Sequence, residues 1–280
     1  MSKSFAAILL SAAALYAPAA AAQPPMNGAG ADRGPAWSAS VGGGLRFAPS
    51  YVGDDNYQLF LLPNIRASYG DRLTLSVPEG VKYDVIKSGG LRIGPNVRPA
   101  FGRNEDGRQP FSIAGDTNTD LLGLGDINTA VEVGGYVSYK TGKTTIGATV
   151  AKALGGHDGV VADVSLRYAD RAMLGKKPLF YSLGPSVRVV DQTFHQSYFG
   201  VTATQSIASG LDVYRPDGGL NSYGFSATAT YPLRKRVAVT AIAGYDRLTE
   251  EAGQSSLVRE RGARDQANLG LFFSYRFGGR

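Results

Sequence analysis

The residues best suited to chemistry in this sequence are His195 and Ser197, which lie on either side of Gln196. Side chains two positions apart point to the same face of a β-strand, where an imidazole can activate a hydroxyl for acyl transfer. In hydrolases that use a His-x-Ser pair the next residue is asparagine, whereas Tyr198 follows here. Spacing identifies no third member of a triad. An acyl hydrolase is therefore one alternative, and it depends on how the surrounding elements fold.

The sequence offers few side chains that could bind a metal or a cofactor. The chain of 280 residues has no cysteine, and its two histidines, His157 and His195, lie in separate segments. Thiol chemistry and cysteine-based metal sites are therefore excluded. The glycines at 42–44 lie within a strand pattern and lack the strand-to-helix context of a phosphate-binding loop. We expect no metal and no cofactor.

The N-terminus has the pattern of a signal peptide over residues 1–22. Lys3 supplies a positive charge, an alanine-rich apolar run follows, and small residues fit a cleavage site after Ala22. Residues 23–35 are predicted to be a flexible mature N-terminus, which leaves 36–280 as one domain. The formal net charge is +6, but the cations are scattered and form no dense tract. We expect an exported protein with no nucleic-acid partner.

Alternation of apolar and polar residues recurs along the whole mature chain. It includes two near-repeats, 91–103 and 181–190, which both contain Gly-Pro-x-Val-Arg. In each repeat Pro and Val fall on the apolar face, while Gly and Arg fall on the polar face. The alternating runs are about ten to twelve residues long, as a tilted membrane crossing requires, whereas soluble strands have about five or six. We therefore predict a barrel whose apolar face meets lipid and whose polar face lines a lumen.

Twelve strands are expected, so the fold is predicted to be an all-β, transmembrane antiparallel barrel of the outer-membrane type with both ends in the periplasm. One expected strand is interrupted near Pro78-Glu79-Gly80, and a true turn there would invert the inside and outside assignment of everything downstream. The expected strands are 36–47, 57–69, 72–86, 90–102, 128–140, 143–152, 159–169, 178–190, 194–204, 221–231, 236–246 and 267–277.

Charged residues alternate onto the predicted lumen face. They suit an ion-pair network that fills a mid-sized barrel, and the alternative is a passive pore with a weak preference for anions. The predicted lumen charges are Arg46, Arg66, Arg98, Glu132, Asp163, Arg167, Arg188, Asp246 and Arg276.

The connections between strands suggest where partners bind. By strand parity, 103–127 is an unusually long periplasmic connection, which makes it a candidate docking loop or, as an alternative, a lumen plug. Loops 205–220 and 247–266 are predicted to face outward, where the second could contact lipopolysaccharide. The residues chosen for the candidate periplasmic loop are Asp120, Leu121, Leu122, Leu124 and Asp126.

The last predicted strand ends in aromatic residues. Phe273, Tyr275 and Phe277 alternate onto its apolar face, and such a terminal strand is similar to the signal read by the bacterial barrel-assembly machinery. Three further residues follow Phe277, whereas the usual signal ends on phenylalanine.

From Trp37 to Phe277 the chain resembles the MipA/OmpV family of outer-membrane proteins. The resemblance rests on 42–57, 80–86, 123–135, 197–211 and 275–277 taken together and in order. It departs from the family before the last strand, where the usual Ser-Pro is absent. The resemblance implies an outer-membrane barrel that binds a membrane-bound lytic transglycosylase and brings it to a bifunctional penicillin-binding protein. It supplies no catalytic residue.

These observations lead to one expectation and two alternatives. We expect a non-enzymatic scaffold in the outer membrane of a Gram-negative cell, in contact with lipid and lipopolysaccharide. The first alternative is the passive, weakly anion-preferring channel. The second is an acyl hydrolase that uses His195 and Ser197, as outer-membrane phospholipase A and the lipid A deacylases use such a pair.

Overall fold

The structure is a computed structural model that describes residues 37–77, 79–115, 117 and 119–277. The predicted signal peptide and the predicted flexible segment 23–35 lie outside the described residues. The elements are β1 (Trp37–Pro49), β2 (Tyr57–Tyr69), β3 (Leu73–Val77), β4 (Gly80–Tyr83), β5 (Ile86–Ser88), β6 (Leu91–Ala100), β7 (Ser112–Ala114), β8 (Ala130–Thr141), β9 (Thr144–Leu154), β10 (Val160–Leu174), β11 (Lys177–Val190), α1 (Gln192–Phe199), α2 (Ala203–Ser209), β12 (Gly219–Pro232), β13 (Val237–Leu248), α3 (Glu250–Gly253), α4 (Ser256–Arg261) and β14 (Asp265–Phe277).

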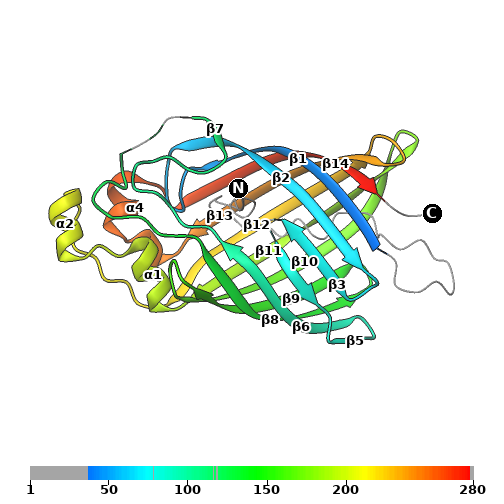
Figure 1. Cartoon of the computed structure of the whole chain (residues 1–280), viewed down its shortest axis with the longest axis horizontal. Helices are drawn as coiled ribbons and strands as arrows, with labels where there is room; N and C mark the ends of the chain where they lie inside the picture. Colours follow the sequence, from blue (N-terminus) through cyan, green and yellow to red (C-terminus); the bar gives the residue numbers. More distant parts are fainter. Residues whose placement is uncertain (1–36, 78, 116, 118, 278–280) are drawn as a thin grey trace, which may run out of the picture.

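The strands close into a twelve-stranded antiparallel barrel (Figure 1). Each strand pairs with its neighbours in sequence, β4 and β5 together form one barrel strand, and β7 is a short addition to the wall. The barrel closes because β1 pairs on one side with β2 and on the other with β14. Val41, for example, lies between Ile65 and Tyr275. The predicted fold class is confirmed.

The two faces of the barrel wall have the predicted chemistry. Val41 is 45% exposed on the outside, whereas the adjacent Ser40 is 6% exposed on the inside. Leu45, Phe47 and most other large apolar strand residues are also exposed on the outer surface. This is the reverse of a soluble sandwich, in which the apolar face forms the core.

The two Gly-Pro pairs of the repeated pentapeptide lie where the strand ladder is interrupted on one side. Pro185 pairs with Phe225 of β12, but between β11 and β10 the paired positions stop at Ser186 and resume at Leu183. Pro95 likewise pairs with Gly135 of β8, opposite the break between β4 and β5. Proline cannot donate to a ladder, so each interruption removes the conflict between proline and a central strand.

Two of the twelve predicted strands are wrong. One of them is two strands and the other is helical, so the total number of barrel strands is unchanged. The segment 72–86 is a hairpin, because Ser76 of β3 pairs with Gly80 of β4. The segment 194–204 is helical instead of extended. Helix α1 begins where the Asp191 side chain accepts a hydrogen bond from the Phe194 amide, and α2 begins with a capping box between Thr202 and Gln205.

The extra turn near 80 inverts the predicted placement of the 103–127 loop. Turns of two to four residues join the strands at the end where β1 begins and β14 ends, and the long connections lie at the opposite end. Outer-membrane barrels keep their short turns in the periplasm, so the long connections face outward. Asp120, Leu121, Leu122, Leu124 and Asp126 therefore lie at the outer end, and the prediction of a periplasmic docking loop is wrong.

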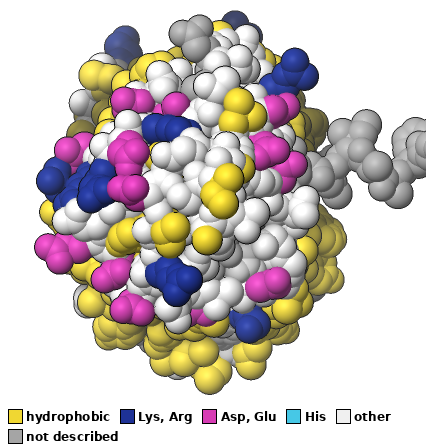
Figure 2. All heavy atoms as spheres, turned by 90° about the vertical axis from the view of Figure 1, so that its left-hand side faces the viewer, with side chains coloured by type: hydrophobic (Ala, Val, Ile, Leu, Met, Phe, Trp, Pro, Cys, Tyr) yellow, Lys and Arg dark blue, Asp and Glu magenta, His cyan; other side chains and the backbone are white. Residues whose placement is uncertain are grey.

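The long outer connections fold together into a cap over the barrel, seen at the left of Figure 1. An inner cap cluster joins the cap to the strand ends and an outer cap cluster joins the connections to one another. Figure 2 shows this end as a filled surface with acidic and basic side chains among apolar ones. The inner cap cluster is Val161, Val190, Phe194, Phe199, Leu248, Ala252 and Val258; the outer cap cluster is Tyr51, Leu121, Leu124, Val201, Leu211 and Leu257.

Candidate functional site in the lumen

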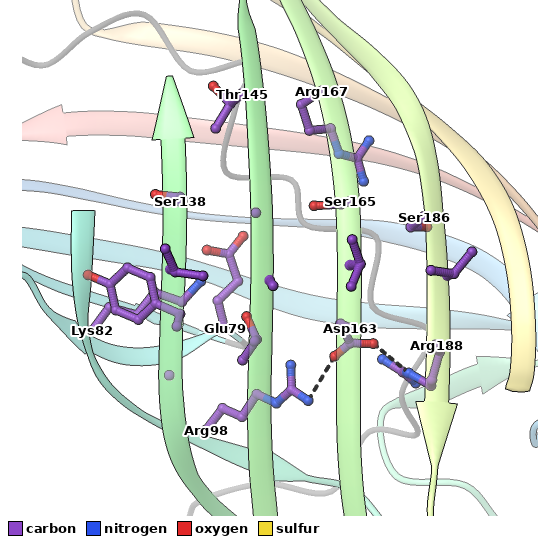
Figure 3. Close-up of a pocket in the computed structure, with 18 of the residues that line it drawn as sticks. Glu79, Lys82, Arg98, Ser138, Thr145, Asp163, Ser165, Arg167, Ser186 and Arg188 are labelled. Atoms are coloured by element: carbon purple, nitrogen blue, oxygen red, sulfur yellow. Dashed lines mark hydrogen bonds and ion pairs between the residues drawn. The ribbon is translucent and has the colours of Figure 1, made fainter. Parts of the chain in front are cut away.

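The barrel encloses a cavity of about 450 Å³. Its lining reaches from Gly90 and Lys140, beside the periplasmic turns, to Leu248 and Gln266, beneath the cap. Figure 3 shows charged and hydroxyl side chains from several strands that converge on this space. The cavity is the candidate functional site, because it gathers most of the charges that the strands direct inward.

The centre of the charged lumen is Asp163 on β10. Its Oδ1 accepts a hydrogen bond from Arg188 Nε at 2.8 Å, and its Oδ2 accepts one from Arg98 Nη2 at 3.1 Å (Figure 3). Arg98 and Arg188 are the final residues of the two Gly-Pro-x-Val-Arg segments. The repeated pentapeptide therefore directs two arginines from different strands onto one carboxylate.

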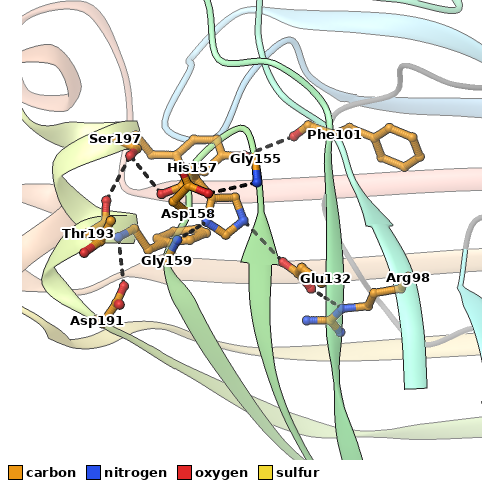
Figure 4. Close-up of polar contacts among 12 residues, drawn as sticks. Arg98, Phe101, Glu132, Gly155, His157, Asp158, Gly159, Asp191, Thr193 and Ser197 are labelled. Atoms are coloured by element: carbon orange, nitrogen blue, oxygen red, sulfur yellow. Dashed lines mark hydrogen bonds and ion pairs between the residues drawn. The ribbon is translucent and has the colours of Figure 1, made fainter. Parts of the chain in front are cut away.

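A second carboxylate connects this group to the outer connections. Arg98 also pairs with Glu132 on β8, and Glu132 Oε1 lies 3.4 Å from His157 Nε2 (Figure 4). His157 Nδ1 accepts a hydrogen bond from the Gly159 amide at 3.1 Å, so the ring proton is on Nε2 and points to Glu132. A continuous polar chain thus runs from the loop 155–159 into the barrel wall.

The remaining predicted lumen charges are spread along the barrel. Arg66 pairs with Glu79 at 3.8 Å, and Arg167 donates to the backbone oxygen of Ser226 at 3.2 Å. Asp246 lines the same cavity as these groups. Arg46 lies on the inward-facing side of β1, and Arg276 lies away from the cavity near the periplasmic end of β14.

Sequence reasoning missed several groups that line the cavity. Arg92 binds Asp84 at 2.6 Å, and the Tyr136 hydroxyl donates to the same carboxylate. Lys82 lies 5.5 Å above the Tyr136 ring. The inward alternation of β4 would have identified Lys82 if the turn near Gly80 had been taken as a true turn.

Cations outnumber carboxylates in the cavity lining. Arg66, Lys82, Arg92, Arg98, Lys140, Arg167 and Arg188 give seven positive charges, and Glu79, Asp84, Asp163 and Asp246 give four negative ones, which leaves an excess of three positive charges. Low-dielectric walls strengthen the field that such an excess creates. The lining therefore carries a net positive charge, which Glu132, bound to Arg98 outside this lining, reduces to two.

The geometry of α1 does not assemble a hydrolase site from His195 and Ser197. Residues two apart on a helix point in nearly opposite directions. His195 Nδ1 donates to the Asp217 backbone oxygen at 2.6 Å, whereas Ser197 Oγ donates to the backbone oxygens of Thr193 and His157 at 2.9 and 3.2 Å. The shared strand face predicted for this pair is wrong, and both side chains hold the cap together.

The loop predicted to bind a partner is part of the cap core. Leu121 and Leu124 are buried in the outer cap cluster, while Leu122 and Asp126 are exposed. Burial raises the pKa of Asp120, whose backbone oxygen accepts from Arg261 Nη1 at 2.9 Å. These residues stabilise the outer end of the barrel.

Arg103 is the most deeply buried cation of the cap. It is 3% exposed, donates to the Tyr198 backbone oxygen at 2.8 Å and forms no ion pair with a described carboxylate. Burial lowers the pKa of Arg103 to about 10 and raises the pKa of Tyr198 to about 12. The cap thus contains ionisable groups that burial has moved from their ordinary pKa values.

The part of the chain that the structure describes has neither a cluster of metal ligands nor a helix that could cross a membrane. No group of three or more His, Cys, Asp or Glu side chains is placed to hold a metal ion within 37–77, 79–115, 117 and 119–277. Across the same ranges, the helices are all too short or too polar to cross a bilayer.

An outward apolar belt, an inward charged lumen and short turns at one end define an outer-membrane β-barrel. The chain belongs to the MipA family, because the family model described as "MltA-interacting protein MipA" matches residues 41–277. The family resemblance and the outer-membrane location predicted from the sequence are confirmed.

Individual relatives are more distant. YiaT of Escherichia coli (strain K12), whose name describes it as an outer membrane protein, is 30% identical over 115 residues. That match spans 41% of this chain and 45% of YiaT, so it covers less than half of either protein.

Solved structures of outer-membrane barrels are similar to this chain at low identity. The NanC porin has 9% identity and a TM-score of 0.40 over 85% of this chain and 98% of its own. The COG4313 outer membrane channel from Pseudomonas putida F1 has 12% identity and a TM-score of 0.40 over 91% of this chain and 100% of its own.

Proposed function

We propose that this protein is a non-enzymatic outer-membrane scaffold that binds a periplasmic murein-remodelling enzyme. The partner is a lytic transglycosylase, as the family description "MltA-interacting protein" suggests, and through it a penicillin-binding protein. The observation that carries the proposal is the folded cap, which fills the outer end of the barrel while the lumen lining reaches the periplasmic turns. A barrel with this asymmetry acts from its periplasmic end.

Access to the periplasmic end supports the same role. The turns between β2 and β3, β5 and β6, β8 and β9, and β10 and β11 contain two or three residues each. A soluble domain can therefore approach the rim without displacing long loops. Docking must use these turns or the rim side chains, since 103–127 lies at the outer end.

A direct binding measurement tests the scaffold role. The full chain, folded and held in a lipid nanodisc, is mixed with purified lytic transglycosylase A, and complex formation is followed by light scattering. We expect a complex with the loaded nanodisc and none with empty nanodiscs. Addition of the penicillin-binding protein should then enlarge the complex. Absence of binding to the loaded nanodisc would contradict the scaffold role.

The passive channel is the second candidate, and the positive excess in the lumen favours it. A conducting lumen would show steady, anion-selective steps in planar bilayers. We expect no steady steps, because the cap fills the outer end. Steady steps from the full chain would replace the scaffold by the channel as the primary function.

The outer surface supports two further interactions. The apolar belt is proposed to contact membrane lipid, and the cap is proposed to contact lipopolysaccharide. Phe273, Tyr275 and Phe277 all face outward on β14, with the rings of Tyr275 and Phe277 4.8 Å apart. This exposed aromatic row supports recognition of β14 by the barrel-assembly machinery.

A further inference from the structure

Cations without carboxylate partners gather on one side of the periplasmic rim. The turns between β10 and β11 and between β12 and β13 lie side by side there, because β11 pairs with β12. Elsewhere on the same rim, Lys87 pairs with Asp71 at 2.5 Å and Lys143 pairs with Asp170 at 2.6 Å. Cations on this side that have no ion pair with a described carboxylate include Lys176, Lys177, Arg234, Lys235, Arg236 and Arg276.

A small cavity of about 70 Å³ lies within this basic rim. Three arginines and one lysine line it together with four hydroxyl side chains, and no acidic residue takes part. The volume exceeds that needed by one water molecule and suits a group of a few heavy atoms. The charged lining is Arg234, Lys235, Arg236 and Arg276, and the hydroxyls belong to Ser40, Thr230, Thr240 and Ser274.

Strand register brings these groups together. Ser40 of β1 pairs directly with Arg276 of β14, and Thr230 of β12 pairs with Thr240 of β13. The Arg276 amide donates to the Arg236 backbone oxygen at 2.8 Å, which places β14 against the β12–β13 turn. The backbone pairing therefore fixes the positions of the Cα atoms from which the Arg236 and Arg276 side chains extend.

Four cations around one small space repel one another. An anion in the cavity would remove that repulsion. It would also accept hydrogen bonds from Ser40, Ser274 and one hydroxyl of the Thr230–Thr240 pair, whose oxygens lie 2.9 Å apart. Guanidinium groups match the oxygens of a phosphate in a bidentate manner, and several donors from different directions suit its tetrahedral shape. We propose that this cavity is a phosphate-binding site at the periplasmic mouth of the barrel.

The phosphate can come from a lipid headgroup or from a soluble compound. Lys177 lies 5.9 Å above the Tyr231 ring, and Arg236 Nη1 lies 3.5 Å from the Tyr275 hydroxyl. Both tyrosines belong to outward-facing rows, which places two cations beside the lipid headgroups. The hydroxyl groups of the cavity instead come from inward-facing positions and are reached from the periplasm.

The full chain in phosphatidylcholine nanodiscs tests the site with two probes. Native mass spectrometry measures enrichment of added phosphatidylglycerol, and calorimetry measures binding of inorganic phosphate. We expect the wild-type protein to bind at least one probe and Arg236→Gln/Arg276→Gln to bind it at least tenfold more weakly. The control Lys87→Gln/Lys143→Gln removes the same charge from the same rim and should bind within twofold of wild type.

The outcomes separate the phosphate sources and decide the proposal. Enrichment of phosphatidylglycerol without binding of inorganic phosphate assigns the site to a lipid, and binding of inorganic phosphate assigns it to a soluble ligand. No binding of either probe overturns the site, as does an equal loss in the control. If the first variant does not fold, Arg234→Gln/Lys235→Gln on the exposed turn replaces it with the same expected loss. No enzyme partner is present, so the result is independent of the scaffold role.

Discussion

Arg98 and Arg188 bind opposite oxygens of the same carboxylate, although three strands separate β6 from β11. Each arginine ends a Gly-Pro-x-Val-Arg segment, and each Gly-Pro lies where the ladder is interrupted on one side. The repeat thus serves one structural purpose. It brings two cations to Asp163, Arg188 from the directly paired strand and Arg98 from a strand further around the barrel, and it tolerates proline by leaving positions of the neighbouring strand unpaired.

Replacement of Asp163 by asparagine should destabilise the barrel. The change leaves Arg98 and Arg188 close together without the charge that both of them bind. Removal of one partner from a buried pair costs about 3–5 kcal/mol, and partial exposure to lumen water should reduce that to about 1–3 kcal/mol. Urea unfolding of the detergent-folded protein, followed by its shift in electrophoretic mobility, measures the loss.

Asp170→Asn is the matched control for that measurement. Asp170 pairs with Lys143 at 2.6 Å, but that lysine is exposed at the rim. Exposed pairs contribute little to stability because solvent screens them, so this variant should unfold close to wild type. Equal losses in the two variants would show that Asp163 has no special place in the lumen.

Gly184→Ala should disturb the interrupted ladder, while Gly147→Ala should not. A Cβ added at Gly184 would lie 1.8 Å from the Leu166 backbone oxygen, whereas at Gly147 the nearest atom is the Ser165 hydroxyl at 3.6 Å. Overpacking of this kind costs about 1–3 kcal/mol, and the clash is with backbone that cannot rotate away. Thermal unfolding in detergent compares the two variants. A Gly184→Ala protein as stable as Gly147→Ala would contradict the close approach.

The barrel could be predicted because lipid imposes a simple pattern on its strands. Most residues on the outside, such as Val41 or Phe273, are apolar because they meet lipid, and every second residue faces the lumen. That constraint acts on each strand separately, so alternation alone revealed the fold class and the inward position of Arg98 and Arg188. The contact of Arg98 with Asp163 could not be predicted, because β6 and β10 are distant in sequence, whereas Arg188 lies directly opposite Asp163 in a hairpin of consecutive strands.

The cap could not be predicted for a related reason. The segment 194–204 alternates as a strand would, but Asp191 and Thr202 supply helix caps, and His195 and Phe199 are buried four residues apart, at a helical spacing. Short helices owe their stability to tertiary packing more than to local preference. In the sequence the hairpin at Gly80 appears only as an interruption of one alternating run. Counting that run as a single strand predicted the wrong end of the barrel for 103–127.

Tyr198→Phe should make the cap less sensitive to alkaline pH. Burial raises the pKa of Tyr198 from 10.0 to about 12, so the folded protein retains a proton that the unfolded chain releases. The stabilisation is complete below pH 10 and is lost as the pH rises toward 12, by up to about 2 kcal/mol. Limited proteolysis of the cap across this range measures the loss. The lipid-facing Tyr139→Phe is the control, and a wild-type cap equally resistant at both ends of the range would contradict the prediction.

Ser197→Ala should leave fatty-acid release at background. Ser197 and His195 form hydrogen bonds to different backbone oxygens and do not contact one another, so no base activates the hydroxyl. Release of fatty acid from phospholipid and lipopolysaccharide, measured for wild type and variant, provides the test. Hydrolysis by the wild type that the variant loses would restore the hydrolase alternative.

Leu257→Ala should loosen the cap without unfolding the barrel. Leu257 is 1% exposed in the outer cap cluster, where it packs with Leu121 and Leu124 from a distant connection. Truncation of a buried leucine costs about 2–5 kcal/mol, and here the loss falls on loops that the strand ladders do not hold. Trypsin should cut faster after Arg259, while the electrophoretic mobility of the folded barrel stays unchanged. Leu269→Ala is the control, because it removes a side chain that is 58% exposed on the lipid face, and trypsin should cut this variant at the wild-type rate. Equal cleavage rates in the two variants would contradict a separately folded cap.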